Sequence, residues 1–344
     1  MQSNIFSYLN AHVDSDTDTG EPLKVYDLFC GAGGFSEGAR QAGCNVVFAC
    51  DNDPDALEVH SANHPECVHK CAELPSDDIP FPTDGSKFHV HGSPPCQAVS
   101  SAGTKDSALI AASLGMISWF VGLATSCGAT SWSMEQVPTA PVVKLLESFR
   151  LKHPSLLSFE VFDFYELGLP QRRKRIISGN PDLISRLLRK RGCIAKLSIQ
   201  DVILRPLGTH IRNTLFSSGR RKRQSNDPKR RNGKFVYKKA GLEQSCYPIR
   251  GPSPTILAGR SSGHWINFVD GTPRKTELRL CDIAALQTFP AGYLFHEKHA
   301  TVRRLIGNAI PPAVSALLLR RHTKKRVLCC PESPSYVSKK HTIV

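Results

Sequence analysis

Short apolar runs alternate with stretches of helical periodicity over the first half of the chain. The runs at 24–30 (KVYDLFC) and 45–50 (NVVFAC) each predict a buried parallel strand, because strands covered on both faces are apolar throughout. A helix around the sequence SEGARQAG separates these two strands. The same reasoning predicts strands at 88–91, 129–134 and 157–168 and a helix at 109–124. This strand–helix order predicts an α/β fold.

The pattern changes after about residue 193. From there to 275 the chain is basic and consists of short, loop-rich segments, which we interpret as a separate small domain. Helical patterns return at 278–290 and after 307–312 (GNAIPP). We therefore expect five segments, namely an acidic N-terminal segment (1–22), a large domain (23–192), a small domain (193–275), a hinge with the final helix (276–322) and a basic tail (323–344).

Composition is ordinary for a globular protein. Of the 344 residues, 40% are hydrophobic and 22% charged, enough for one large core and a smaller lobe. We find no uninterrupted apolar run of about 18 residues and no basic-then-apolar secretion signal at the N-terminus. An intracellular protein without a membrane partner is expected, and in a eukaryote the basic segment at 220–231 would also suit nuclear import.

The twelve cysteines contain no Cys-x-x-Cys pair, which argues against a disulfide scaffold. His64, Cys67, His69 and Cys71 are the nearest approach to a metal site. They lack the paired spacing of structural zinc ligands, so no metal is expected.

The net charge of +14 is concentrated in blocks. Residues 220–239 hold ten Lys or Arg against one Asp. Such a block suits a solvated segment or a nuclear address, and it equally suits binding to a polyanion such as nucleic acid. Charge alone leaves these alternatives open.

A glycine-rich turn follows the first strand, and an acidic residue ends the second. Gly31 and Gly33 allow a close approach of the backbone to a ligand, and Asp51 lies where ribose hydroxyls are commonly bound. The position after Gly33 that a dinucleotide site fills with a third glycine is Ser36 here. The turn therefore suits a nucleoside with a charged tail better than a pyrophosphate.

Cys96 lies on a stiff turn after the strand that ends near His91. Pro94 and Pro95 fix the backbone there, and a thiol at the carboxyl end of a strand in an α/β sheet is a candidate nucleophile. Alone, such a cysteine is more typical of a buried structural residue. Glu135 ends another predicted strand and is a candidate acid, although in isolation it would suit the surface.

Six blocks, in order, resemble the motifs of the cytosine-C5 DNA methyltransferase family over roughly residues 24–320. They are 27–35 (DLFCGAGGF), 94–97 (PPCQ), 135–137 (EQV), 171–175 (QRRKR), 286–290 (LQTFP) and 307–312 (GNAIPP).

The resemblance implies a Rossmann-like S-adenosylmethionine-dependent methyltransferase domain and a small target-recognition domain that faces it across a cleft for double-stranded DNA. It implies a monomer that transfers a methyl group to carbon 5 of a flipped-out cytosine through a covalent cysteine adduct. The implied catalytic residues are Cys96, Glu135, Arg173 and Arg175. The implied cofactor-binding residues are Asp27, Phe29, Gly31, Gly33, Gly34, Asp51, Asn52, Pro95, Asn308 and Ile310. The implied DNA-binding residues are Gln97, Ser100, Arg220, Arg221, Lys222, Arg223 and Thr255.

Three positions depart from the family pattern. Gln136 replaces the usual Asn, and the run 69–72 (HKCA) lacks the usual Asp for the adenine amine. The loop after Gln97 is shorter and lacks the usual Gly- and Asp-containing form. Two other functions stay open, a tRNA cytosine-5 methyltransferase and a catalytically silent DNA-binding regulator with the same fold.

Overall fold

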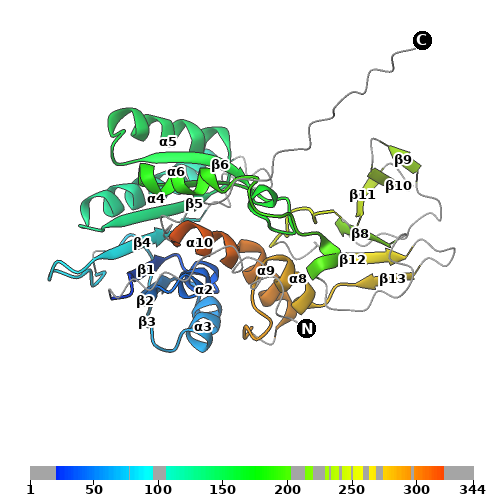
Figure 1. Ribbon diagram of the computed structural model, residues 1–344, viewed down its shortest axis with the longest axis horizontal. Coiled ribbons are helices and arrows are strands. Elements are labelled where there is room, and N and C mark those ends of the chain that lie inside the picture. The colour runs from blue at the N-terminus through cyan, green and yellow to red at the C-terminus, as the bar shows by residue number, and fades with distance from the viewer. Residues whose placement is uncertain are drawn as a thin grey trace, which may run out of the picture.

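The computed structural model describes residues 21–76, 78–95, 106–202, 214–219, 229–231, 234–239, 242–248, 251–258, 263–268, 274–295 and 298–320. Two sheets dominate it (Figure 1). The first has seven strands, and the second has six antiparallel strands from the later part of the chain. The prediction of an α/β, Rossmann-like domain with a second, smaller domain is confirmed for these residues.

The large sheet has the order β3-β2-β1-β4-β5-β7-β6. Its strands are β1 (Lys24–Leu28), β2 (Asn45–Asp51), β3 (Val68–Cys71), β4 (Phe88–Gly92), β5 (Ser131–Gln136), β6 (Ser158–Asp163) and β7 (Lys174–Gly179). Only β7 runs antiparallel to its neighbours β5 and β6. The strand order reverses between β1 and β4, and ligands of such sheets bind at the carboxyl ends of the strands beside that point.

Helices cover both faces of the large sheet, because side chains alternate along each strand. Val25 of β1 joins a core with α2 (Gly34–Gln41), α6 (Pro181–Arg189) and α10 (Pro312–Leu319). Its neighbour Tyr26 joins the opposite core, which packs against α4 (Ser107–Ser126) and α5 (Ala140–Lys152). A third core lies around α3 (Pro54–Asn63), α7 (Ile199–Val202), α8 (Leu280–Leu286) and α9 (His299–Asn308).

The second sheet has the order β13-β12-β8-β11-β10-β9. Its strands are β8 (Thr214–Gly219), β9 (Lys229–Arg231), β10 (Lys234–Lys239), β11 (Leu242–Pro248), β12 (Gly263–Phe268) and β13 (Arg274–Glu277). Five of these strands fall inside the small domain expected at 193–275, where periodicity had indicated only loop-rich structure, and β13 extends two residues beyond it.

Two segments beyond residue 193 pack with the large domain. Ile199 and Val202 of α7 are buried with Ile256 in the core of the large domain. Backbone hydrogen bonds also join Arg172 to Ser253 and Ile199 to Gly251. Residues 194–202 and 251–258 therefore pack with the large domain, because their few apolar side chains find partners that are distant in sequence.

Two element boundaries also differ from the prediction. The strand expected at 157–168 ends at Asp163, whose side chain accepts a hydrogen bond from the Tyr165 N–H and starts the 3₁₀ turn η1 (Phe164–Leu167). The helix expected at 278–290 ends at Leu286, and Thr288 follows with φ of +66°.

Among the described residues, one helix, α4, is long and apolar enough to bear on the expectation about membrane spans. By length and composition alone it could cross a bilayer, although its Ile117, Phe120 and Val121 are buried against the sheet. One such helix is weak support for a span, because core helices have the same composition.

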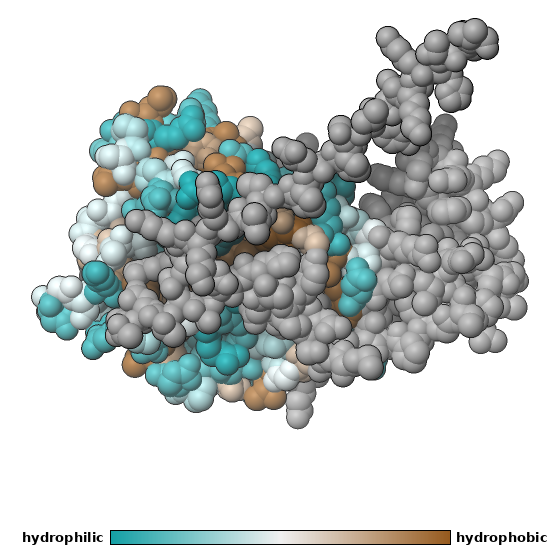
Figure 2. All heavy atoms as spheres, viewed as in Figure 1, coloured by the Kyte–Doolittle hydropathy of each residue, from teal (hydrophilic) through white to brown (hydrophobic). Residues whose placement is uncertain are grey.

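Large exposed hydrophobic side chains such as Leu109 and Leu151 are scattered, and the face in Figure 2 mixes hydrophilic and hydrophobic residues.

Helices α2 and α10 pack closely because α2 carries glycines one turn apart. A Cβ atom at Gly34 would lie 2.3 Å from the Ile310 carbonyl oxygen, and one at Gly38 would lie 2.3 Å from the Pro312 carbonyl oxygen. The 307–312 segment is thus fixed beside the glycine-rich turn, as the family resemblance implies.

Gly38→Ala is therefore expected to lower the free energy of unfolding by roughly 1–3 kcal/mol through overpacking. The matched control is Gly122→Ala in α4, where a Cβ would meet no atom within 4 Å. It is expected to raise stability by roughly 0.5–1 kcal/mol, because glycine is costly within a helix. Urea denaturation measures both, and a Gly38→Ala protein as stable as the parent contradicts the close approach of the two helices.

Candidate active site

The loop after β1 has a left-handed backbone at three positions. Phe29, Gly31 and Gly33 have φ angles of +58°, +53° and +83°, a region that glycine adopts without steric cost. The Gly31 N–H donates to Asp51 Oδ2 at 2.8 Å, and the Asp53 N–H donates to Asp51 Oδ1 at 2.9 Å. The structure thus joins the glycine-rich turn to the acidic end of β2, as predicted from the spacing.

The groups on this loop suit a nucleoside cofactor. The Phe29 ring is partly buried and meets the Trp119 ring edge-on, with centroids 6.2 Å apart. A Cβ at Gly31 would meet no atom within 4 Å, so a ligand can approach the backbone there. An aromatic wall, close backbone approach and a carboxylate suit an adenosine with a charged tail. Sequence reasoning missed Trp119, because a lone Trp in an apolar helix gives no sign of where it points.

Asp27 lies beneath this loop and not on its ligand side. It is fully buried, and its Oδ2 accepts a hydrogen bond of 2.7 Å from the Ser36 hydroxyl. Ser36 Oγ also lies 2.9 Å from His60 Nε2, and His60 Nδ1 lies 2.8 Å from His69 Nε2. Burial, the largest cause, raises the pKa of Asp27 to about 7. Asp27 therefore supports the loop through Ser36, and its contact with the cofactor stays a prediction.

The other predicted cofactor residues differ in exposure. Asn52 and Pro95 are exposed after β2 and β4, and Asn308 is exposed at the end of α9. Ile310 is buried, and its carbonyl lies against Gly34.

The turn that carries the candidate nucleophile is described up to Pro95, so Cys96 lies outside the described residues. Gln136 at the end of β5 donates from its side-chain amide to the Pro94 carbonyl oxygen at 2.7 Å, and it is almost fully buried. This contact fixes the end of β5 to the start of the Pro-Pro-Cys turn. The longer side chain that replaces the family's usual Asn therefore still reaches the turn.

Glu135 and Arg175 form an ion pair beside this turn. Arg175 Nε lies 2.6 Å from Glu135 Oε1, and both side chains are largely buried. They come from the neighbouring strands β5 and β7, which pair antiparallel with Gln136 opposite Ile176. The two predicted catalytic groups are thus brought together at one edge of the sheet.

Arg173, the other predicted catalytic arginine, binds backbone carbonyl groups. It is 1% exposed, and its guanidinium donates to the carbonyl oxygens of Ile256, Gly307 and Ala309 at 3.1 to 3.2 Å. Its donors hold backbone segments together, and the contact of Arg173 with the base stays a prediction.

Two buried glutamines bind the same backbone segments as Arg173, and sequence reasoning missed their role. Gln171 donates to the Gln287 side chain at 2.6 Å and accepts from the Ile256 N–H at 2.8 Å. Gln287 donates to the Ala309 carbonyl at 2.7 Å. These contacts join the QRRKR and LQTFP blocks to the segment just after α9, and the only sequence signal was the presence of both blocks.

Of the predicted DNA-binding residues, only Thr255 is described. Its hydroxyl donates to the Arg172 carbonyl oxygen at 2.8 Å, which places Thr255 next to the QRRKR block. Gln97, Ser100, Arg220, Arg221, Lys222 and Arg223 lie outside the described residues. Within the part of the chain that the structure describes, no group of three or more His, Cys, Asp or Glu is arranged to hold a metal ion.

Buried histidines make stability dependent on pH. Burial, the largest cause in each case, lowers the pKa of His89 to about 3 and of His64 to about 4, and lowers those of His60 and His91 as well. Between about pH 4 and 6.5 the unfolded chain binds protons at these rings that the folded chain does not. Stability is therefore lost as the pH falls. The raised pKa of Asp27 acts in the opposite direction and offsets part of this loss of stability.

We expect the free energy of unfolding, measured by urea denaturation, to fall between pH 7 and pH 5 by on the order of 1 kcal/mol per pH unit for each uncompensated ring. His91→Gln removes one such ring and is expected to make the pH dependence shallower. His153→Gln is the control, because His153 is exposed at the end of α5. Identical pH slopes for the two variants would show that His91 does not carry this effect.

The family follows from comparison with known proteins. A sequence profile described as C-5 cytosine-specific DNA methylase matches residues 23–114 and 156–324. The match covers most of the chain, so the protein belongs to this family, whose members take the methyl group from S-adenosylmethionine. The unmatched stretch 115–155 contains β5 with Glu135 and Gln136.

Two similar proteins are Type II methyltransferases. M.HgiDI of Herpetosiphon aurantiacus is 27% identical over 311 residues, which cover 84% of this chain and 90% of that protein. M.HindV of Haemophilus influenzae is 26% identical over 313 residues, which cover 84% of this chain and 92% of that protein.

Solved structures share the fold. A prophage-encoded protein of E. coli assigned as a DNA modification methyltransferase has a TM-score of 0.59 at 19% identity, with 87% of this chain and 97% of that chain covered. A Spodoptera frugiperda DNMT2 variant has a TM-score of 0.54 at 14% identity, with 87% and 98% covered. Similarity at this level of identity concerns the fold alone.

Proposed function

We propose that this family member is an active DNA cytosine-5 methyltransferase that acts on a flipped-out cytosine through a transient bond to Cys96. The observation that carries the proposal is the chain of contacts along β5. Glu135 pairs with Arg175, and the next residue, Gln136, holds Pro94 of the cysteine turn. Glu135, Arg175 and the start of the turn that carries Cys96 thus lie on one edge of the sheet, next to the glycine-rich loop.

The proposed chemistry follows from the reactivity of cytosine. Its carbon 5 is a poor nucleophile within the aromatic ring, and addition of the Cys96 thiolate to carbon 6 makes carbon 5 enamine-like. Glu135 would donate a proton toward N3 as negative charge builds there, while Arg175 orients the Glu135 carboxyl group and stabilises the base carbonyl. Carbon 5 then takes the methyl group, and loss of the carbon 5 proton expels the cysteine.

The residues of the glycine-rich loop would hold the methyl donor. Phe29 would contact the adenine, Asp51 the ribose, and the Gly31–Gly33 backbone the methionine tail. S-adenosylmethionine supplies the electrophilic methyl group when bound.

The DNA contacts belong to the proposal as well. Carbon 6 is shielded in a stacked duplex, so the cytosine must leave the helix, at a cost of roughly a few kcal/mol. Thr255 beside the QRRKR block would support the nucleotide backbone, and the basic residues Arg220 to Arg223 would bind phosphates. An enzyme that acts on DNA works where DNA is kept, so an intracellular location, nuclear in a eukaryote, accompanies the proposal, as does a monomeric state.

Two measurements test it together. Bisulfite sequencing of DNA from a bacterium that expresses the chain should reveal 5-methylcytosine in a fixed sequence context. Duplex DNA with 5-fluorocytosine in that context should give a denaturation-resistant adduct when S-adenosylmethionine is present. Methylation of tRNA and not of DNA would favour the RNA alternative. DNA binding with neither methylation nor adduct would favour the silent regulator.

A further inference from the structure

Histidines of β4 and serines of β5 form a continuous buried chain of hydrogen bonds. Ser131 Oγ lies 2.8 Å from His89 Nδ1, and His89 Nε2 lies 2.9 Å from Ser133 Oγ. Ser133 Oγ lies 2.8 Å from His91 Nδ1, and His91 Nε2 lies 3.1 Å from Ser93 Oγ. The register explains the chain, since His89 is opposite Ser131 and His91 is opposite Ser133.

The middle of this chain is closed to solvent. His89 and Ser133 are 0% exposed and His91 is 1% exposed. The Phe35 ring of α2 stacks on His91 with centroids 3.5 Å apart and planes 3° from parallel. Burial lowers the pKa of both rings, with Arg186 a second cause for His89 and His89 a second cause for His91, so both rings are neutral near pH 7.

A neutral imidazole has one N–H and one acceptor nitrogen, and a hydroxyl can both donate and accept. All four hydrogen bonds can therefore run from Ser131 to Ser93, or all four can run from Ser93 to Ser131. The two arrangements use the same heavy-atom positions and differ only in the tautomers of the two rings and the rotation of the three hydroxyls. A chain whose hydrogen bonds can all reverse in this way can conduct a proton from one end to the other.

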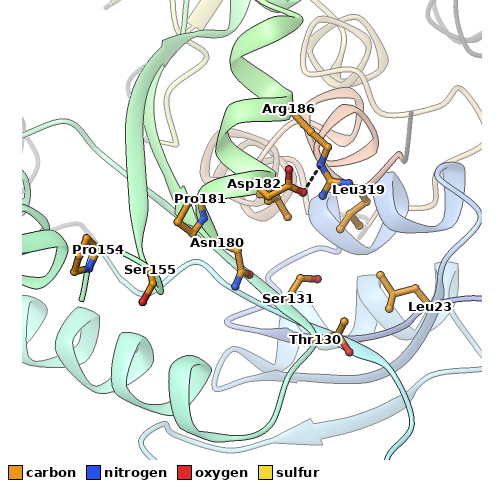
Figure 3. A pocket seen from close by; sticks show the side chains of 11 residues that line it. Leu23, Thr130, Ser131, Pro154, Ser155, Asn180, Pro181, Asp182, Arg186 and Leu319 are labelled. Atoms are coloured by element: carbon orange, nitrogen blue, oxygen red, sulfur yellow. Dashed lines mark ion pairs between the residues drawn. The ribbon is translucent and has the colours of Figure 1, made fainter. Parts of the chain in front are cut away.

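The two ends of the chain reach opposite edges of the sheet. Ser93 is partly exposed and stands three residues before Cys96 in the sequence. Ser131, also partly exposed, lines a pocket of about 600 Å³ at the other edge. Figure 3 shows Ser131 beside Thr130 in this pocket, with Asn180 above them and the Asp182–Arg186 ion pair beyond.

We propose that Ser93, His91, Ser133, His89 and Ser131 are a proton wire between the catalytic turn and this pocket. The inference rests on the proposed function, in which carbon 5 releases one proton per methyl group transferred. A proton accepted at Ser93 Oγ is passed to His91 Nε2 while His91 Nδ1–H gives its proton to Ser133, and His89 repeats the exchange. Ser131 then gives one proton to water in the pocket, so one proton enters and one leaves while both rings change tautomer. These five are positioning and relay residues and need not touch the base.

Ser133→Ala breaks the wire at its centre and leaves both rings in place. The rate of tritium release is measured with DNA that carries tritium at carbon 5 of the target cytosine. Active sites are counted by formation of the 5-fluorocytosine adduct. The rate per active site should fall about tenfold or more in Ser133→Ala. The solvent deuterium isotope effect on this rate should rise. Ser133→Thr keeps a hydroxyl and should restore most of the rate. Ser178→Ala is the matched control, a buried serine of β7 without a hydrogen-bond partner among the described residues, and should release tritium at the parental rate.

A second measurement needs no methylation. In protein labelled with ¹⁵N-histidine, the His91 ring N–H should exchange with solvent deuterium quickly despite its burial, and Ser131→Ala at the far end should slow this exchange about tenfold. If the network serves only packing, the His91 ring N–H exchanges slowly and Ser131→Ala leaves that rate unchanged, or Ser133→Ala releases tritium at the parental rate. Either result overturns the proposed proton wire. Ser131-dependent exchange in a protein that methylates no DNA would support the wire and reject the proposed function.

Discussion

Replacement of Cys96 by serine is expected to reduce methyl transfer by roughly a thousandfold or more, because a serine hydroxyl is far less nucleophilic than a thiolate at neutral pH. The geometry of the turn should persist, since Gln136 holds it through the Pro94 carbonyl and not through the side chain at 96. Single-turnover transfer of a radiolabelled methyl group to duplex DNA measures the loss. The Cys96→Ser protein should also give no adduct with 5-fluorocytosine DNA.

Cys71→Ser is the matched control, since Cys71 is exposed at the end of β3 in the same sheet. Its transfer rate should remain within about twofold of the parent, because surface substitutions away from special features are nearly neutral. DNA affinity should be unchanged in both variants. Parental methylation by Cys96→Ser would eliminate the covalent mechanism while leaving the fold and family intact.

The arrangement of the sheet was largely predictable because it depends on local pattern. Buried strands such as β1 and β2 are mostly apolar, and the glycine-rich turn between β1 and α2 has a fixed spacing to Asp51. The meeting of Gly31 with Asp51 and of Glu135 with the cysteine turn then follows from the rule that adjacent parallel strands end at one edge.

Contacts distant in sequence were not predictable in the same way. The QRRKR block identifies Arg173 and Arg175 equally, yet Arg173 serves backbone carbonyls more than 80 residues away while Arg175 pairs with Glu135. A sequence motif records residue types and spacing but not the direction of each side chain. The direction of each arginine side chain is set by packing, because Ile256 and residues 307–309 lie where Arg173 reaches them and Glu135 lies where Arg175 reaches it.

The histidine–serine chain illustrates the same limit. His89 and His91 alternate with apolar residues, as a half-exposed strand would, and Ser131 and Ser133 do the same on β5. Either pattern alone indicates a solvent-facing side. Because the strands pair with each histidine opposite a serine, the polar groups satisfy one another and the face is buried under α2.

Glu135→Gln is expected to lower the rate of methyl transfer about a hundredfold to ten-thousandfold, the range of a lost general acid. The amide keeps the size of the side chain and can accept from Arg175, but it can neither carry the negative charge that pairs with Arg175 nor return a proton to N3 of the base. The loss should therefore appear in the single-turnover rate and not in DNA affinity. Arg175 is largely buried, so its unpaired charge should also reduce thermal stability modestly.

Glu160→Gln is the control that separates catalysis from a lost ion pair. Glu160 lies on β6, which is separated from β5 by β7 in the same sheet, and pairs with Arg191 at 3.7 Å, but it is more exposed and belongs to no predicted catalytic block. Its single-turnover rate should stay near the parental value, because exposed ion pairs contribute little. If Glu135→Gln and Glu160→Gln transfer methyl groups equally fast, the carboxyl group of Glu135 supplies no proton and the acid must be sought elsewhere at the edge of the sheet.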